Sequence, residues 1–181
     1  MNRRLKIYNF IILFNLFIYL SVLDIFGQNY QKSFYLEERF KKETKIPIKA
    51  LNALKKEKEI TKCINFYKKN KSNLLPYSSK WFRAAKVNLN SDKYPDLIIE
   101  QNTPCLSGVS SQPYWLLVNN GTDYNVVLYA YTYFLYINTK KTNEHFNVTI
   151  DWATASTLFK ATFGFDGKRY KRIAYIEKPN N

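Results

Sequence analysis

The sequence predicts an α+β fold, in which N-terminal helices precede an antiparallel meander of about eight short strands forming a partial propeller-like or sandwich-like sheet. Apolar residues between positions 60 and 67 recur at i, i+3, i+4 and i+7, the spacing of one helix face. Apolar and polar residues alternate over 146–152 and 159–165, as in half-buried strands. The pairs Asn120-Gly121 and Asp166-Gly167 are typical of type I′ hairpin turns, in which both residues take positive φ.

The composition is that of one folded domain. A chain of 181 residues is long enough to bury a substantial core. Aromatic residues make up 17% of the chain and there are only five glycines, which indicates a packed protein and not a disordered one.

The chain is strongly basic, with a formal net charge of +14. Such an excess of Lys and Arg raises nucleic acid as a possible partner. The chain is also crowded with Asn, Ile, Tyr and Phe, the residues that an AT-rich genome encodes. We therefore interpret much of the lysine as compositional drift on a solvated surface, and we do not expect a nucleic-acid partner.

Residues 1–27 have the layout of a cleaved secretory signal peptide. A basic start is followed by a nearly unbroken apolar run over 10–23 and by the small residue Gly27. Asp24 lies near the end of this run, where a charge would be costly in a membrane anchor. We expect a secreted or periplasmic protein with no membrane span after cleavage. The alternative is an uncleaved anchor over 7–26, which is long enough to cross a bilayer.

Residues 28–75 are predicted to be a helical segment. An amphipathic pattern begins at Tyr30 and Phe34, and Pro47 interrupts it. Ile48, Leu51 and Leu54 then recur every three residues, before the stronger pattern over 60–67. The polar faces are rich in lysine, which we interpret as a solvated helix surface; the alternative is a face for an anionic polymer or lipid headgroups.

Residues 76–181 are predicted to be a β-rich domain. The consecutive apolar residues 97–99 indicate a strand that is buried on both faces. The predicted strands cover residues 81–87, 97–100, 114–118, 124–131, 133–137, 146–152, 157–165 and 170–176.

A polar loop between the first two of these strands is a candidate calcium site. Asn88, Asn90, Asp92 and Asp96 stand at relative positions 1, 3, 5 and 9, a spacing that turns several side-chain oxygens towards one point in a tight loop. The alternative is a set of Asx turns, in which the same side chains accept hydrogen bonds from nearby backbone N–H groups.

The stretch N-L-N-S-D-K-Y-P-D-L-I-I that begins at Asn88 resembles the D-L-N-G-D-G-x-x-D-hydrophobic signature of FG-GAP and VCBS-type repeats. Over about residues 81–175 the chain resembles small secreted bacterial proteins of uncharacterised function that hold one such loop. In those proteins the loop precedes a Cys/Gly/Ser-rich loop, a W-x-hydrophobic strand and an F-D-G-x-x-Y hairpin, which are C-L-S-G, Y-W-L-L-V and F-D-G-K-R-Y in this chain. The resemblance implies calcium bound through Asp side chains, although Asn88 and Lys93 replace an Asp and a Gly of the signature.

Cys63 and Cys105 are the only cysteines. In an exported protein such a pair suggests a disulfide, which would tie the last helix to the loop after the 97–100 strand. Two free buried thiols are the alternative. Because the sequence has no Cys/His cluster, we do not expect zinc.

The sequence lacks an evident catalytic set. His145 is the only histidine, and it has no nucleophile motif such as G-x-S-x-G near it. Asp92 and Asp96 share one loop, an arrangement that suits a shared cation or turn capping better than the flanking of a scissile bond. We therefore predict a non-catalytic binding module, with an exported hydrolase as the alternative.

Two surfaces are predicted to bind a partner, either an unidentified protein or a cell-surface polymer. The first holds Tyr114, Trp115 and tyrosines near 129–136, because alternate strand positions place some aromatic rings on an outer face; the alternative is that these rings pack within the sheet, since aromatic residues suit strands. The second holds Lys168, Arg169 and Arg172 on a basic edge strand, where the alternative role is protection against strand-to-strand aggregation. A third reading is an inhibitor or immunity-type protein that uses residues 101–113 against a cell-wall enzyme.

Overall fold

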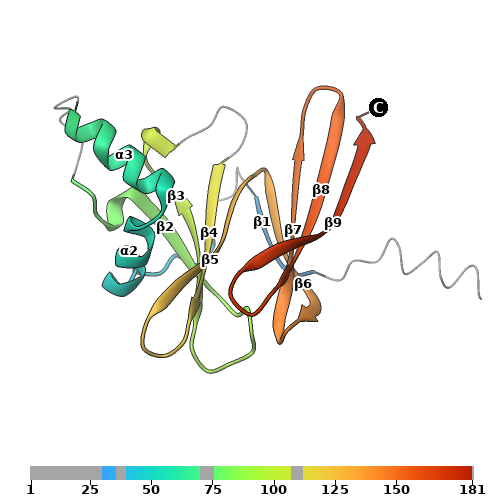
Figure 1. Ribbon diagram of the computed structural model, residues 1–181, viewed down its shortest axis with the longest axis horizontal. Coiled ribbons are helices and arrows are strands. Elements are labelled where there is room, and N and C mark those ends of the chain that lie inside the picture. The colour runs from blue at the N-terminus through green and yellow to red at the C-terminus, as the bar shows by residue number, and fades with distance from the viewer. Residues whose placement is uncertain (1–29, 36–39, 70–75, 107–111, 181) are drawn as a thin grey trace, which may run out of the picture. The chain divides into compact units, whose positions relative to one another are not determined.

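A computed structural model of the chain describes residues 30–35, 40–69, 76–106 and 112–180 (Figure 1). Except for Tyr30, these residues belong to the compact unit Gln31–Asn181. The predicted signal peptide, residues 1–27, lies outside the described residues. The helices and strands follow in the order β1 (Tyr30–Tyr35), α2 (Ile48–Lys55), α3 (Lys58–Lys69), η1 (Ser79–Trp81), β2 (Phe82–Val87), β3 (Asp96–Gln101), η2 (Pro104–Leu106), β4 (Gln112–Asn119), β5 (Tyr124–Thr132), β6 (Phe134–Thr142), β7 (His145–Ala153), β8 (Thr157–Phe165) and β9 (Tyr170–Pro179).

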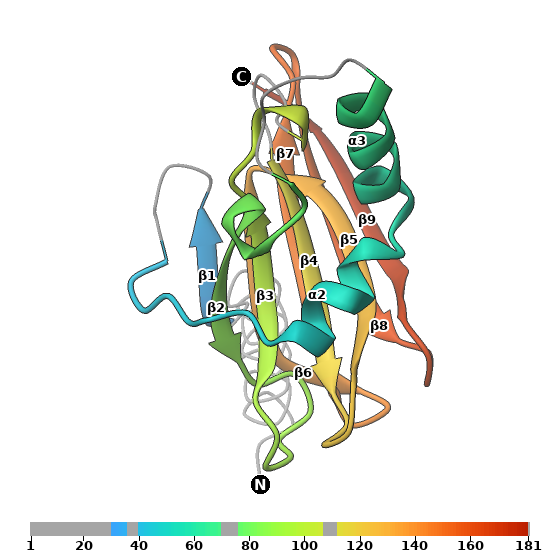
Figure 2. The same cartoon turned by 90° about the vertical axis from the view of Figure 1, so that its left-hand side faces the viewer.

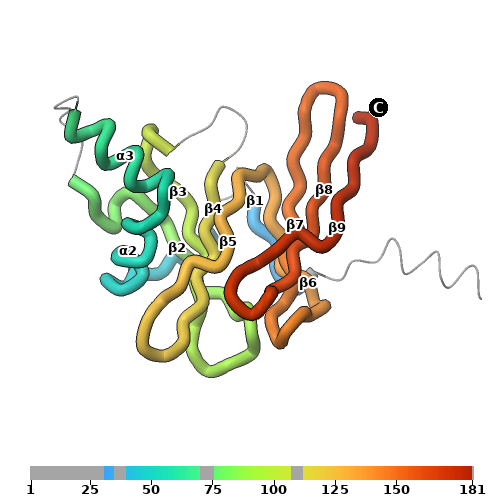
Figure 3. The backbone as a smooth tube through the Cα atoms, viewed as in Figure 1, coloured from blue at the N-terminus to red at the C-terminus, as the bar shows by residue number. Residues whose placement is uncertain are grey.

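The strands form two antiparallel sheets, which confirms the predicted α+β class. One sheet has the order β2-β3-β4-β5 and the other the order β1-β6-β7-β8-β9. Figures 1 and 2 show α2 and α3 on one side of the four-stranded sheet and the strands β6 to β9 on its other side. The chain passes from one sheet to the other between β5 and β6, which are separated by Tyr133 alone (Figure 3).

The first described strand corrects the sequence prediction. A helical pattern was expected to begin at Tyr30 and Phe34, but these residues belong to β1. β1 lies next to β6 in the five-stranded sheet, and Phe34 packs against the core between the two sheets. Tyr30 and Phe34 are four residues apart, a spacing that fits one face of a strand as well as one face of a helix. Pairing with β6 therefore decides the conformation of this segment.

One hydrophobic core lies between the two sheets. It combines residues of the four-stranded sheet, such as Ile98 and Leu116, with residues of the five-stranded sheet, such as Ile137, Val148 and Ile150. Val148 and Ile150 alternate with polar residues along β7, as the period of two predicted.

A second core lies between the four-stranded sheet and the helices. Leu97, Ile99 and Trp115 face this side, together with Ile60 and Cys63 of α3. Because Ile98 faces the other core, β3 is buried on both faces, which confirms the prediction from its consecutive apolar residues.

The turns differ from the prediction. At Asn120-Gly121 and Asp166-Gly167 only the glycines take positive φ, of 89° and 98°. Asn120 and Asp166 instead accept hydrogen bonds from the backbone N–H groups two and three residues later, so both are Asx turns and not type I′ turns. The turn in which both residues take positive φ is Asn143-Glu144, between β6 and β7, at 46° and 63°.

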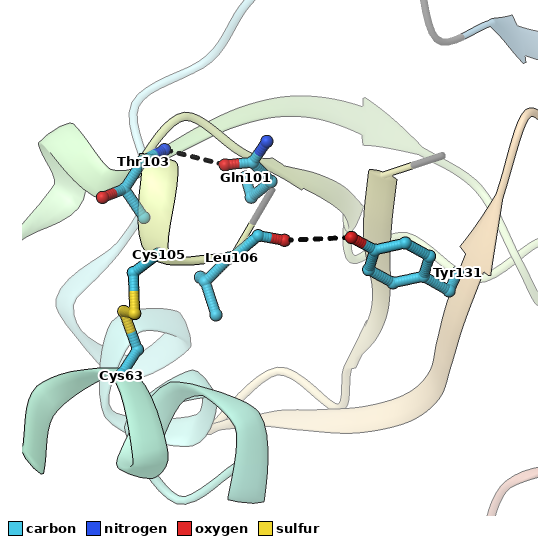
Figure 4. The surroundings of a disulfide bond; sticks show 6 residues. All are labelled: Cys63, Gln101, Thr103, Cys105, Leu106 and Tyr131. Atoms are coloured by element: carbon cyan, nitrogen blue, oxygen red, sulfur yellow. Dashed lines mark hydrogen bonds between the residues drawn. A yellow bond between two sulfur atoms is a disulfide. The ribbon is translucent and has the colours of Figure 1, made fainter. Parts of the chain in front are cut away.

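Cys63 of α3 and Cys105 of η2 form the predicted disulfide, with Cα atoms 5.9 Å apart (Figure 4). The bond ties the helical layer to the end of β3, as the sequence suggested. Neither described helix combines the length and the apolar character that crossing a membrane requires.

Reduction of this disulfide should lower the free energy of unfolding by about 4 kcal/mol, because the bond closes a long loop in the unfolded chain. Urea denaturation of residues 28–181 with and without a phosphine reductant measures the difference. Cys63→Ala/Cys105→Ala is the control and should not respond to the reductant. Equal stability of the oxidised and reduced wild-type protein would contradict the prediction.

Candidate functional site

The predicted calcium loop is built from Asx turns. Asn88 Oδ1 accepts a hydrogen bond from the Ser91 N–H at 2.5 Å, and Asp92 Oδ1 accepts one from the Tyr94 N–H at 2.7 Å. Asn90 contacts Asp92 twice, as an acceptor from its N–H and as a donor to its carboxylate. These are the contacts expected of the alternative interpretation of the sequence.

Asp96 has a different environment from the rest of the loop. It is the first residue of β3 and is fully buried. Its two carboxylate oxygens accept hydrogen bonds from the N–H groups of Leu89 and Asn119, both at 2.8 Å. The Leu89 carbonyl in turn accepts a hydrogen bond from Phe146 of β7, so this carboxylate holds the loop where the two sheets meet.

Burial raises the pKa of Asp96 to about 6, although both backbone hydrogen bonds act to lower it. The negative charge of Asp92 also raises this pKa, and the nearby His145 lowers it.

The hydrogen bonds within the loop limit how many of its oxygens could bind a calcium ion. The loop has two carboxylates, Asp92 and Asp96, and both oxygens of Asp96 already accept backbone hydrogen bonds beneath the surface. Calcium needs six to eight oxygen ligands and binds more weakly as the ligand charge falls. The arrangement therefore does not present all four predicted residues to one ion, and calcium binding stays a prediction of the sequence.

A groove beside the disulfide exposes aromatic side chains. Phe66 of α3 and Tyr129 and Tyr131 of β5 are 58%, 40% and 39% exposed. The Tyr131 hydroxyl donates to the Leu106 carbonyl at 3.4 Å, which joins β5 to η2 (Figure 4). We call this hollow of about 450 Å³ the aromatic groove; its walls are Glu59, Lys62, Cys63, Phe66, Cys105, Leu106, Tyr129 and Tyr131.

Tyr129 links the aromatic groove to the core. Its ring packs at 5.3 Å from the ring of the fully buried Trp115. Burial raises the pKa of Tyr129 to about 12, and the negative charge of Glu59 acts in the same direction. Tyr129 therefore stays a neutral hydroxyl, able to donate and accept hydrogen bonds, at physiological pH.

Tyr114 and Trp115 do not form the predicted binding face. Both are fully buried, because β4 is covered by the helices on one face and by the second sheet on the other. The exposed tyrosines are their neighbours on β5, at the edge of the four-stranded sheet. Tyr129 and Tyr131 stand at alternate positions, which the sequence already indicated as one face of a strand. Phe66 was missed, because it lies on the lysine-rich face of its helix.

A buried polar cluster lies at the other end of β3. Arg83 and Glu100 form an ion pair at 2.6 Å, and Gln112 donates hydrogen bonds to Glu100 and to the Tyr114 hydroxyl. Burial raises the pKa of Glu100, while the Arg83 charge lowers it. Arg83 and Gln112 both contact the Glu100 carboxylate, so its buried charge is compensated within the four-stranded sheet. The cluster is therefore part of the structure of this sheet.

Lys168, Arg169 and Arg172 lie on the β8–β9 hairpin, apart from the aromatic groove. Lys168 and Arg169 occupy its turn, and Arg172 lies in β9 with its guanidinium 5.1 Å from the Tyr175 ring centre. β9 is an edge strand of the five-stranded sheet, as the sequence predicted. The exposed apolar residues of this strand, Ile173 and Ile176, were missed, because the sequence does not show that both faces of the strand stay exposed.

His145 is engaged in packing. Its ring stacks on Phe165 at 3.8 Å, and its Nδ1 lies 2.9 Å from the Asn143 carbonyl oxygen. In the described part of the chain, no group of three or more His, Cys, Asp and Glu side chains could hold a metal ion.

No family model, curated protein or solved structure matches the chain.

Asp96→Asn should remove one component of the pH dependence of stability. The folded-state pKa of about 6 lies above the ordinary value of 3.8, so the folded protein binds more protons between these values and its unfolding free energy falls as pH rises. The stability advantage of the wild type over Asp96→Asn should therefore shrink by about 2 kcal/mol from pH 4 to pH 7. Urea denaturation of both proteins at each pH measures it; an advantage that grows with pH would contradict the prediction.

Calcium titration calorimetry on residues 28–181 tests the loop. From the hydrogen bonds that its oxygens already accept, we expect no saturable heat at calcium concentrations up to about 1 mM. Asp92→Asn is the suitable control, because Asp92 is exposed whereas Asp96 supports the fold. A saturable heat that Asp92→Asn abolishes would restore this loop as a metal site.

Proposed function

We propose that the protein is an exported, non-catalytic binding module that holds a partner protein or a cell-surface polymer against the aromatic groove. The observation that carries the proposal is the exposure of Phe66 of α3 and of Tyr129 and Tyr131 of β5 on the walls of one hollow. Exposed apolar groups gathered in this way mark interaction sites more often than isolated ones do.

The walls of the aromatic groove are fixed before a partner arrives. The disulfide joins α3 to η2, and the Tyr131–Leu106 hydrogen bond joins η2 to β5. Tyrosine offers a large amphipathic contact area at a small cost in side-chain entropy. A preorganised surface of this kind loses little further entropy on binding.

Export is supported by two features. The basic and apolar segments of residues 1–27 have the order of a signal peptide. Disulfides persist in oxidising compartments and are rare in the reducing cytosol.

An inhibitor or immunity-type role is a second candidate for the same surface. η2, within the predicted contact segment 101–113, forms one wall of the aromatic groove. Residues 107–111 of that segment lie outside the described residues. The predicted alternative is an exported hydrolase that uses Asp92 or Asp96; the Asp96 carboxylate is buried and closed to a substrate, which leaves only the exposed Asp92 for that role.

Tyr129→Ser/Tyr131→Ser should weaken binding by about tenfold or more, since the loss of two interface tyrosines removes most of the exposed aromatic area. Sedimentation with purified insoluble peptidoglycan tests a polymer, and crosslinking to a cell-envelope fraction followed by titration of the captured protein tests a protein partner.

Ile48→Ser is the matched control, since Ile48 is 69% exposed but belongs to α2 and not to the aromatic groove. All three proteins should unfold cooperatively and stay folded at the temperature of the binding assay, although loss of the Tyr129–Trp115 and Tyr131–Leu106 contacts lowers the stability of the double variant. Equal binding by the wild type and the double variant would refute the role of the groove.

A further inference from the structure

β9 offers an open sheet edge. It spans ten residues, of which all but Ile173, at a shift in register, pair with β8, and no other described strand pairs with it. In an antiparallel edge strand, alternate N–H and C=O groups point away from the sheet and are available to another strand. After Tyr170, every residue of β9 is exposed.

Large apolar side chains line this edge. Ile173, Tyr175 and Ile176 are 55%, 43% and 44% exposed, and Leu158 of the neighbouring β8 is 47% exposed. Tyr175 and Ile176 are consecutive, so their side chains project to opposite faces of the sheet. Apolar contacts are thus available on both sides of the open edge, which suits an added strand better than it suits a flat surface.

The same hairpin is basic. Between positions 166 and 178 it carries five Lys and Arg residues and two acidic residues. Of the two acidic residues, Asp166 pairs with Lys171 at 3.4 Å, and Glu177 lies near the Tyr175 hydroxyl. Arg172 and Lys178 are the cations that remain along β9.

We propose that β9 binds an extended acidic segment of a partner protein, which adds a strand to the five-stranded sheet. Backbone hydrogen bonds would supply affinity, and side chains at alternate positions would supply specificity. Acidic residues of the segment would face Arg172 and Lys178, and its apolar residues would cover Ile173, Tyr175 and Ile176. No residue of this surface belongs to the aromatic groove, so the proposal stands apart from the function proposed above.

Charge argues against one of the two other occupants of such an edge, and geometry argues against the other. Two copies of a chain with net charge +14 repel each other, and edge-to-edge pairing would bring their cations together. An anionic membrane would attract the cations but would contact one face of the sheet, leaving either Tyr175 or Ile176 in water.

The test uses residues 28–181 and an acetylated, amidated peptide of ten residues in which pairs of Glu alternate with pairs of Val, so that acidic and apolar side chains lie on both faces of the added strand. Fluorescence anisotropy should detect binding at low salt, with affinity falling about tenfold or more at high salt because the charges are screened. Amide hydrogen exchange within β9 should slow when the peptide is present. The same peptide N-methylated at every Val lacks the donors that strand pairing needs, and it should bind about tenfold more weakly or not at all.

Arg172→Glu/Lys178→Glu should weaken binding of the peptide about tenfold or more. Tyr129→Ser/Tyr131→Ser should leave it unchanged, which separates this surface from the aromatic groove. Equal affinity for the methylated peptide would overturn strand addition in favour of charge attraction alone. Absence of peptide binding would overturn the proposal. Dimerisation in sedimentation would then assign the edge to a second copy, and binding to phosphatidylglycerol vesicles would assign it to a membrane.

Discussion

Burial of the four-stranded sheet on both faces is the constraint from which the rest of the structure follows. Leu97 and Ile99 of β3 need cover on one side and Ile98 needs cover on the other, so the strand requires helices as well as a second sheet. The same constraint leaves two carboxylates of β3, Asp96 and Glu100, inside the protein. Each is held by specific donors, because an unpaired buried carboxylate would be costly.

Helices and strands that are indicated by patterns among neighbouring residues could be predicted from the sequence. The spacing over 60–67 identified α3, and the alternation along β7 and β8 identified strands that the structure contains. The two cysteines predicted the disulfide, because the protein was expected to be exported to an oxidising compartment. β1 was not predictable, since its Tyr30–Phe34 spacing is shared by helix and strand and only its partner β6, about a hundred residues away, decides between them.

The candidate sites were less predictable, because they depend on which surfaces the sheets cover. Asn88, Asp92 and Asp96 have the spacing of a metal loop, but Asn88 and Asp92 accept hydrogen bonds from backbone N–H groups within the loop. Asp96 is turned inwards by Asn119, a residue that the sequence does not place near it. Trp115 was a candidate for a binding face, but it is buried because the sheet is covered on both faces.

The aromatic groove depends on the compartment in which the protein is found. Only Ile60 and Cys63 among the twelve residues of α3 are fully buried, with Ile64 and Tyr67 packed partly against the core. Burial of so few side chains contributes a few kcal/mol, about as much as ordering one turn of a helix costs. The disulfide at Cys63 therefore supplies much of what keeps α3 against η2. Since Phe66 lies one turn further along the same helix, the shape of the groove depends on a bond that an oxidising environment maintains.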